Sequence, residues 1–111
     1  MVYDFAAKIK DIKDDKIFSM GLLDENIIEI GERMGRLLEI QFVLPDEPPF
    51  KDVLVKTEVS VSSMPRYHDI ELQEAIDTFK AYLSEIAHIL DGKVSESEAF
   101  YTSSKTYGRL Y

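Results

Sequence analysis

The chain has 111 residues and a formal net charge of −8, with 45% apolar residues, 31% charged residues and no cysteine. This length and balance predict a single globular domain, and the missing cysteine excludes disulfide scaffolds, thiolate metal sites and cysteine nucleophiles. The acidic charge disfavours direct binding to nucleic acid or anionic membrane, and no stretch resembles a membrane span or a signal peptide, so we expect a cytoplasmic protein.

The first predicted element is an amphipathic helix at the N-terminal end of the sequence. Apolar residues recur there at three- and four-residue steps, at Val2, Phe5, Ile9 and Ile12. Such spacing is typical of a helix with one buried face, and this helix would end near Asp14. The segment 16–20 that follows is equally compatible with a strand and with a turn.

A second helix is predicted from Asp24, which is a good N-cap residue. Gly31 and Gly35 lie four residues apart beside its apolar stripe, although each glycine costs about 1 kcal/mol in a helix interior. We interpret Gly31 as a position of close packing and Gly35 as a left-handed C-cap. Both are candidate interaction residues, because a glycine lets another backbone approach closely.

Two strands are predicted next, and we expect them to pair as an antiparallel hairpin. Apolar residues alternate over residues 37–44, which indicates a strand, although the same residues are also compatible with a longer preceding helix. A proline-rich loop follows at 45–52. Residues 53–62 carry β-branched side chains at alternate positions, which makes them the clearest strand of the chain.

A long helix is predicted over residues 69–91, with Asp69 as its N-cap and Gly92 as its stop. The predicted fold class is therefore α+β: three helices packed on a small antiparallel sheet, in one domain spanning residues 1–98. We expect the second strand to pack against the long helix through two sets of apolar side chains, Val55, Val59 and Val61 on the strand and Phe79, Leu83 and Ile86 on the helix.

Residues 99–111 differ from the rest, because they contain no acidic residue. Disordered tails are usually poor in aromatic residues, whereas this segment has several. We therefore interpret it as an aromatic, weakly basic docking tail, with a flexible end as the open alternative. Its candidate interaction residues are Phe100, Tyr101, Tyr107, Arg109 and Tyr111.

Two groups of residues invite a chemical interpretation. Glu85 and His88 have the Glu-x-x-His spacing of di-iron bundles, but the apolar face of the long helix turns both toward solvent, so we expect no metal. Arg66, Tyr67 and His68 form a candidate anion site before the long helix. A polar turn is the favoured interpretation there, and we predict no catalytic residue and no cofactor.

The leading functional hypothesis is a non-catalytic protein–protein interaction or assembly protein, which binds a protein partner or itself as a homo-oligomer. A two-stranded hairpin is marginal alone, and its edges favour pairing with another strand. One alternative is a small acidic inhibitor that imitates nucleic acid on a larger enzyme. Another is a small ligand-binding domain or enzyme around Arg66, Tyr67 and His68.

Overall fold

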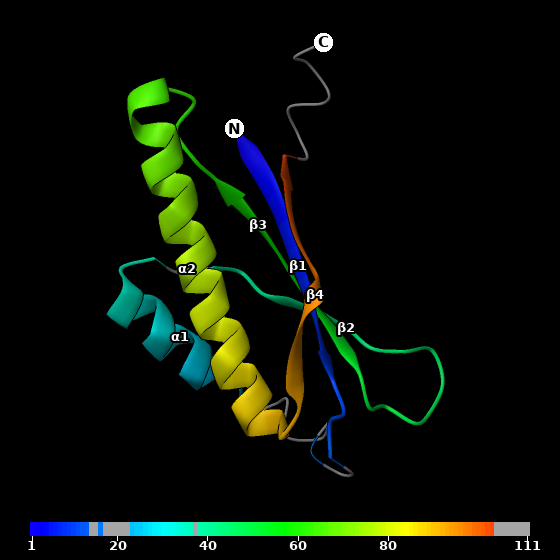
Figure 1. Ribbon diagram of the computed structural model, residues 1–111. Coiled ribbons are helices and arrows are strands. Elements are labelled where there is room, and N and C mark those ends of the chain that lie inside the picture. Colours follow the sequence, from blue (N-terminus) through cyan, green and yellow to red (C-terminus); the bar gives the residue numbers. More distant parts are fainter. Residues whose placement is uncertain (14–15, 17–22, 37, 104–111) are drawn as a thin grey trace.

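The structure is a computed structural model that describes residues 1–13, 16, 23–36 and 38–103, with side chains described throughout these ranges except at 23–27 and 96–103. Six elements follow one another along the chain (Figure 1): β1 Val2–Lys10, α1 Leu23–Met34, β2 Gln41–Val43, β3 Val53–Ser60, α2 Pro65–Leu90 and β4 Lys93–Ser103. Within the described ranges, neither helix has the length and apolarity that a membrane-spanning segment needs.

The four strands form one antiparallel sheet in the order β2-β3-β1-β4. Both helices lie on the same side of this sheet, so the fold has two layers (Figure 1). The element order βαββαβ, combined with this strand order, is the topology of the ferredoxin-like or split βαβ fold. Such a fold supports many unrelated functions, so function has to be argued from particular sites.

The sequence prediction was right about the α+β class and wrong about three helices, because residues 2–10 form a central strand. Tyr3, Phe5, Ala7 and Ile9 alternate along β1 and all pack against the helix layer. Phe5 and Ile9 satisfy the helical spacing and the strand alternation equally well. The strand is formed because β1 pairs with β3 on one side and with β4 on the other.

The predicted hairpin exists, but its first strand is much shorter than residues 37–44. Of the described residues 38–44, only Gln41–Val43 pair with β3, in an antiparallel register. Just before β2, side chains replace the ladder: the Leu38 N–H donates to the Tyr82 hydroxyl at 3.0 Å, and the Thr57 hydroxyl donates to the Glu39 carbonyl at 2.6 Å. The second strand is close to its predicted range.

Gly35 ends α1 as predicted, with a φ of 76°. The Arg36 N–H donates to the Gly31 carbonyl at 2.9 Å and the Gly35 N–H donates to the Glu32 carbonyl at 3.3 Å. These two bonds form a Schellman motif, which satisfies carbonyls that the helix end would otherwise leave unpaired.

Helix α2 begins four residues earlier than predicted and ends for a different reason. Pro65 occupies its first turn and Met64 is its N-cap, so Asp69 is not the cap. At the other end Asp91, rather than Gly92, adopts the left-handed conformation, with a φ of 55°. A Cβ at Gly92 would lie 2.8 Å from the Ile9 side chain and 2.9 Å from the Lys10 carbonyl oxygen, so glycine is needed there for close packing.

The core lies between the sheet and α2, as predicted. Val55 and Val59 belong to the same buried cluster as Phe79, Leu83 and Ile86, and Val61 is buried as well. The Phe5 and Phe79 rings are tilted against each other with centroids 5.6 Å apart. This geometry is favourable for aromatic pairs.

Strand β4 includes residues 99–103 of the proposed tail, whereas residues 104–111 lie outside the described part of the chain. Its pairing with β1 is interrupted: Ala6 pairs with Phe100, but Lys8 pairs with Ser95. Residues 96–99 therefore lie opposite Ala7 as an irregular bulge. Bulges on edge strands disfavour pairing with another chain, and β2 at the opposite edge is only three residues long.

Candidate functional site

A hollow beside the face of the sheet that the helices leave uncovered is a candidate ligand-binding or catalytic site. It has a volume of about 410 Å³ and lies where β1, β3 and the chain before β2 meet. It is lined by Asp4, Phe5, Ala6, Glu39, Gln41, Lys56, Thr57 and Glu58. Its charged side chains are of both signs, and the Thr57 hydroxyl already donates to the Glu39 carbonyl. The hollow is therefore polar. None of the carboxyl groups that line it is buried, as a carboxyl group in acid–base catalysis would have to be.

Metal ligands are not gathered anywhere in the described ranges, where no group of three His, Asp or Glu side chains is placed to hold an ion. Glu85 is half-buried and His88 is exposed on α2. The Glu-x-x-His spacing alone does not make a site, since such a pair needs facing carboxylates from other helices.

Arg66, Tyr67 and His68 lie on the first turn of α2, but they do not converge on one point. The Arg66 guanidinium lies over the Tyr67 ring, 5.6 Å from its centroid. His68 is occupied on both ring nitrogens: Nε2 is 2.7 Å from the Tyr3 hydroxyl, and Nδ1 is 2.9 Å from an Asp69 carboxylate oxygen. With both nitrogens partnered, the histidine has no free group to offer an anion.

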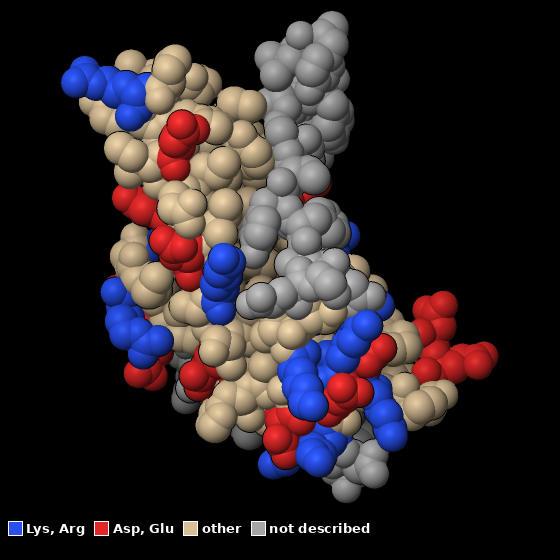
Figure 2. Space-filling view, viewed as in Figure 1, with Lys and Arg blue, Asp and Glu red and all other residues tan. Residues whose placement is uncertain are grey.

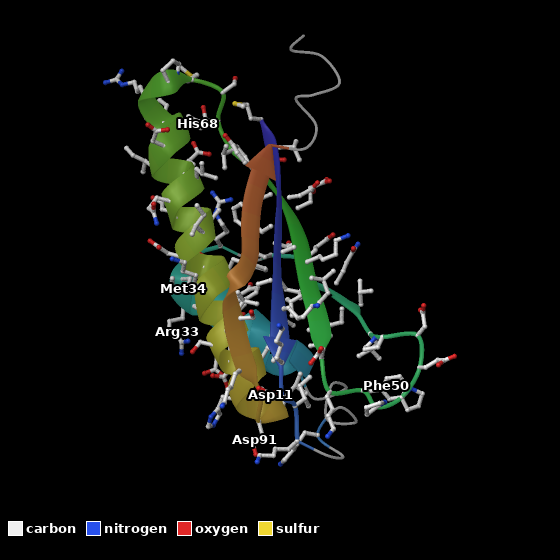
Figure 3. All side chains as sticks on the ribbon, turned by 45° about the vertical axis from the view of Figure 1, so that its right-hand side comes forward. Asp11, Arg33, Met34, Phe50, His68 and Asp91 are labelled. Atoms are coloured by element: carbon white, nitrogen blue, oxygen red, sulfur yellow. The ribbon has the colours of Figure 1, made fainter. Side chains whose placement is uncertain are left out.

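The Tyr3–His68–Asp69 chain of hydrogen bonds joins the two layers of the fold. Tyr3 comes from β1. His68 comes from the first turns of α2, as Figure 3 shows. For this hydroxyl to act in a reaction, a substrate would have to bind beside it, but neither Tyr3 nor His68 lines the hollow. We interpret these hydrogen bonds as a structural contact that holds the start of α2 against β1.

Around the start of α2, next to this contact, lies an apolar surface that the sequence prediction did not include. Met64, Tyr67 and Ile70 keep 57%, 44% and 59% of their surface exposed. They follow one another at three-residue steps, which places them on one side of the helix start. With Arg66, which stacks on Tyr67, they form a surface that we call the α2 tip patch.

Part of this surface was detectable from the sequence. Ile70 precedes Phe79 by nine residues, which is a rotation of about 180° on a helix. An apolar residue opposite the buried face is therefore expected to face solvent. Because the sequence prediction began the helix at residue 69, Met64 and Tyr67 were assigned to a turn, and the strip was not recognised.

Other large apolar side chains are exposed, but they do not form a strip. Ile28 and Met34 on α1 are six residues apart, as Met64 and Ile70 are, but the residue midway between them is Gly31, which is buried and has no side chain. Val43 and Leu44 are consecutive at the end of β2, where neighbouring side chains point to opposite sides. Among the exposed large apolar side chains of the described residues, only Met64, Tyr67 and Ile70 form a series at three-residue steps.

The other predicted interaction residues are dispersed. Gly31 is buried within α1, and a Cβ on Gly35 would meet no atom within 4 Å. The backbones of Phe100 and Tyr101 pair with Ala6 and Phe5 of β1. Tyr107, Arg109 and Tyr111 lie outside the described residues.

Figure 2 shows how charge is distributed over one side of the molecule. The end at which α2 begins is mostly uncharged, with a basic side chain at its tip, whereas acidic and basic side chains are interspersed farther down. A protein that imitates nucleic acid would present a continuous negative stripe, and the lower part of this side is mixed instead.

Comparisons with known proteins inform the fold alone. No protein-family model matches this chain, and no curated protein matches it. A solved structure described as "De novo designed protein Foldit4" is similar, with a TM-score of 0.57 over 95% of this chain and 100% of that chain. Sequence identity is 13%, so the likeness concerns the arrangement of helices and strands.

Proposed function

We propose that this protein is a non-catalytic protein-interaction module whose contact surface is centred on the α2 tip patch. The observation that carries the proposal is the clustering of three large, roughly half-exposed apolar side chains with a stacked arginine on one helix start. Contiguous exposed apolar surface is typical of interaction sites. Aromatic residues, methionine and arginine are also the residue types enriched in interface centres.

The scaffold beneath the patch supports this proposal, because it holds the patch in place before any partner binds. The Tyr3–His68 hydrogen bond fixes the first turns of α2 from below. The Ser62 N–H donates to a Glu71 carboxylate oxygen at 3.0 Å, which fixes the chain entering the helix. A preorganised surface loses less conformational entropy on binding than a mobile one.

A site-specific photo-crosslinking experiment in cells of the source organism tests the proposal. A photoreactive phenylalanine analogue is placed at Tyr67 or Ile70, with Ser84 as the matched control. Ser84 is exposed on the same helix, about 21 Å along the axis from Ile70.

We expect adducts of discrete mass from positions 67 and 70, and none from position 84. Adducts of unchanged yield after Met64→Ser or Arg66→Ser would contradict a specific contact at the patch. Absence of adducts from both patch positions, with the protein present at its normal level, would overturn the proposal.

A further inference from the structure

The outer face of α2 carries a ridge with opposite charges at its two ends. Arg66, Ile70 and Glu74 follow one another at four-residue steps, and all three are exposed. Residues four apart lie above one another on one side of a helix. The ridge therefore shows, in chain order, a positive charge, an apolar side chain and a negative charge, with the two charges about 12 Å apart along the axis.

This ridge is complementary to a second copy of itself. Two such helices can pack antiparallel around a two-fold axis that passes between their Ile70 side chains. The two isoleucines then meet at the centre, and each Arg66 lies at the same height as the other copy's Glu74. A two-fold interface brings the same patch of both subunits together, so the Arg66–Glu74 charge pair occurs twice in each dimer. Helices packed in this way approach to about 8–10 Å between axes.

The neighbouring side chains are compatible with this arrangement. Tyr67 and Gln73 lie about 60° to either side of Ile70, so each copy's Tyr67 would lie beside the other copy's Glu74, and each Gln73 beside the other copy's Arg66. Gln73 is already oriented by a hydrogen bond from its Nε2 to an Asp77 carboxylate oxygen at 2.9 Å. Asp69 and Glu71 lie about 100° to either side, so their charges fall at the rim, where solvent screens them.

We infer that this protein self-associates through the α2 outer face, as an antiparallel two-fold dimer in which Arg66 of each copy pairs with Glu74 of the other. The inference rests on the proposed function, since it names a second copy as the partner of the α2 tip patch. A contact of a few helical turns is smaller than a standard interface, so the dimer belongs to the weak, concentration-dependent class.

Charge reversal with rescue tests this geometry in the purified full-length protein. Sedimentation equilibrium is measured from about 10 μM to 1 mM at ~0.1 M ionic strength, where the Debye length is about 10 Å. The samples are wild type, Arg66→Glu, Glu74→Arg, the double variant, and an equimolar mixture of the two single variants. Lys80→Glu is the matched control, because it is exposed on α2 and, like Arg66→Glu, takes the net charge from −8 to −10.

We expect wild type to approach twice the monomer mass as concentration rises. Each single variant should weaken self-association at least about tenfold, because two attractive contacts per dimer become repulsive. Glu74→Arg should also weaken self-association, although it reduces the net negative charge from −8 to −6. The double variant and the mixture should regain wild-type affinity within about threefold, because both restore opposite charges across the axis, and Lys80→Glu should stay within the same range.

Three results would overturn the inference: a wild type that stays monomeric up to 1 mM, a mixture of the single variants that stays monomeric, or a Lys80→Glu effect as large as that of Arg66→Glu. Circular dichroism melting of each variant establishes that it is folded. A monomeric wild type whose patch positions still form adducts in cells would remove self-association and leave the interaction function. A monomer without adducts would remove both.

Discussion

Helix α2 consists of two regions that use apolar residues in opposite ways. All of its buried residues lie within residues 75–90, where the helix covers the sheet. None of residues 65–74 is fully buried: Tyr67 and Ile70 are exposed, and Leu72 is half-buried against the edge of the core. Residues 75–90 bury apolar side chains against the sheet. Residues 65–74 are held to β1 by the Tyr3–His68 hydrogen bond, and they leave Tyr67 and Ile70 exposed to water.

The difference shows which part of the helix is constrained by stability and which part is open to another use. Burial of apolar surface stabilises the fold by about 25 cal/mol per Å² removed from water. Phe79, Tyr82 and Leu83 contribute this stabilisation because they are almost completely enclosed. Ile70, with 59% of its surface exposed, contributes little of it, and it belongs to the surface that we propose as a contact site.

The largest effect is expected in the buried region. Leu83 is 2% exposed within the core, and Leu83→Ala should lower the free energy of unfolding by about 2–5 kcal/mol, from lost burial together with the cavity left behind. Chemical denaturation monitored by circular dichroism measures the change. Ile70→Ala on the same helix serves as the control, and a loss below about 1 kcal/mol for Leu83→Ala would contradict the assignment of the buried face.

A smaller loss is expected from a buried hydroxyl. The Tyr82 hydroxyl accepts a hydrogen bond from the Leu38 N–H at 3.0 Å, and its ring is fully enclosed. Tyr82→Phe keeps the ring but leaves that N–H unpaired, which should cost about 1–3 kcal/mol. Tyr67→Phe, at an exposed ring, is the matched control. Equal effects of the two substitutions on denaturation midpoints would show that the Tyr82 bond does not stabilise the chain before β2.

The sequence was sufficient to predict the elements whose apolar pattern agrees with a single period. Residues 53–62 alternate clearly, and residues 72–90 keep a helical stripe, so β3 and most of α2 were expected. Gly35 was likewise predictable as a C-cap, because its lack of a Cβ permits the left-handed conformation that ends α1. In each case local preference and tertiary packing favour the same structure.

The sequence was insufficient where pairing partners decide the structure. Residues 2–10 fit two periods at once, and only the ladders with β3 and β4 favour the strand. Residues 99–103 are predicted as part of a separate tail because no acidic residue occurs after Glu98, whereas they pair with β1 beyond the bulge at residues 96–99. The Tyr3–His68 contact joins residues 65 positions apart, and no local pattern of the sequence indicates such a contact.

The smallest effect on stability is expected at the α2 tip patch, where substitutions test most directly whether the two regions of α2 differ in role. Replacing Met64, Tyr67 and Ile70 together by serine removes most of the exposed apolar surface of this helix start, but it creates no cavity, because none of the three is enclosed. Serine has a helix propensity close to those of tyrosine and isoleucine. The free energy of unfolding, measured by chemical denaturation at a protein concentration below about 10 μM, should therefore change by less than about 2 kcal/mol in total, because serine at the N-cap position 64 also offsets part of the lost burial. Adducts from a photoreactive residue at Gln73, which is exposed about 60° from Ile70 on the same helix, should nevertheless disappear, since the partner's apolar contact is lost. A loss of more than about 2 kcal/mol would show instead that these side chains stabilise the fold itself, and the two regions of α2 would then have the same role.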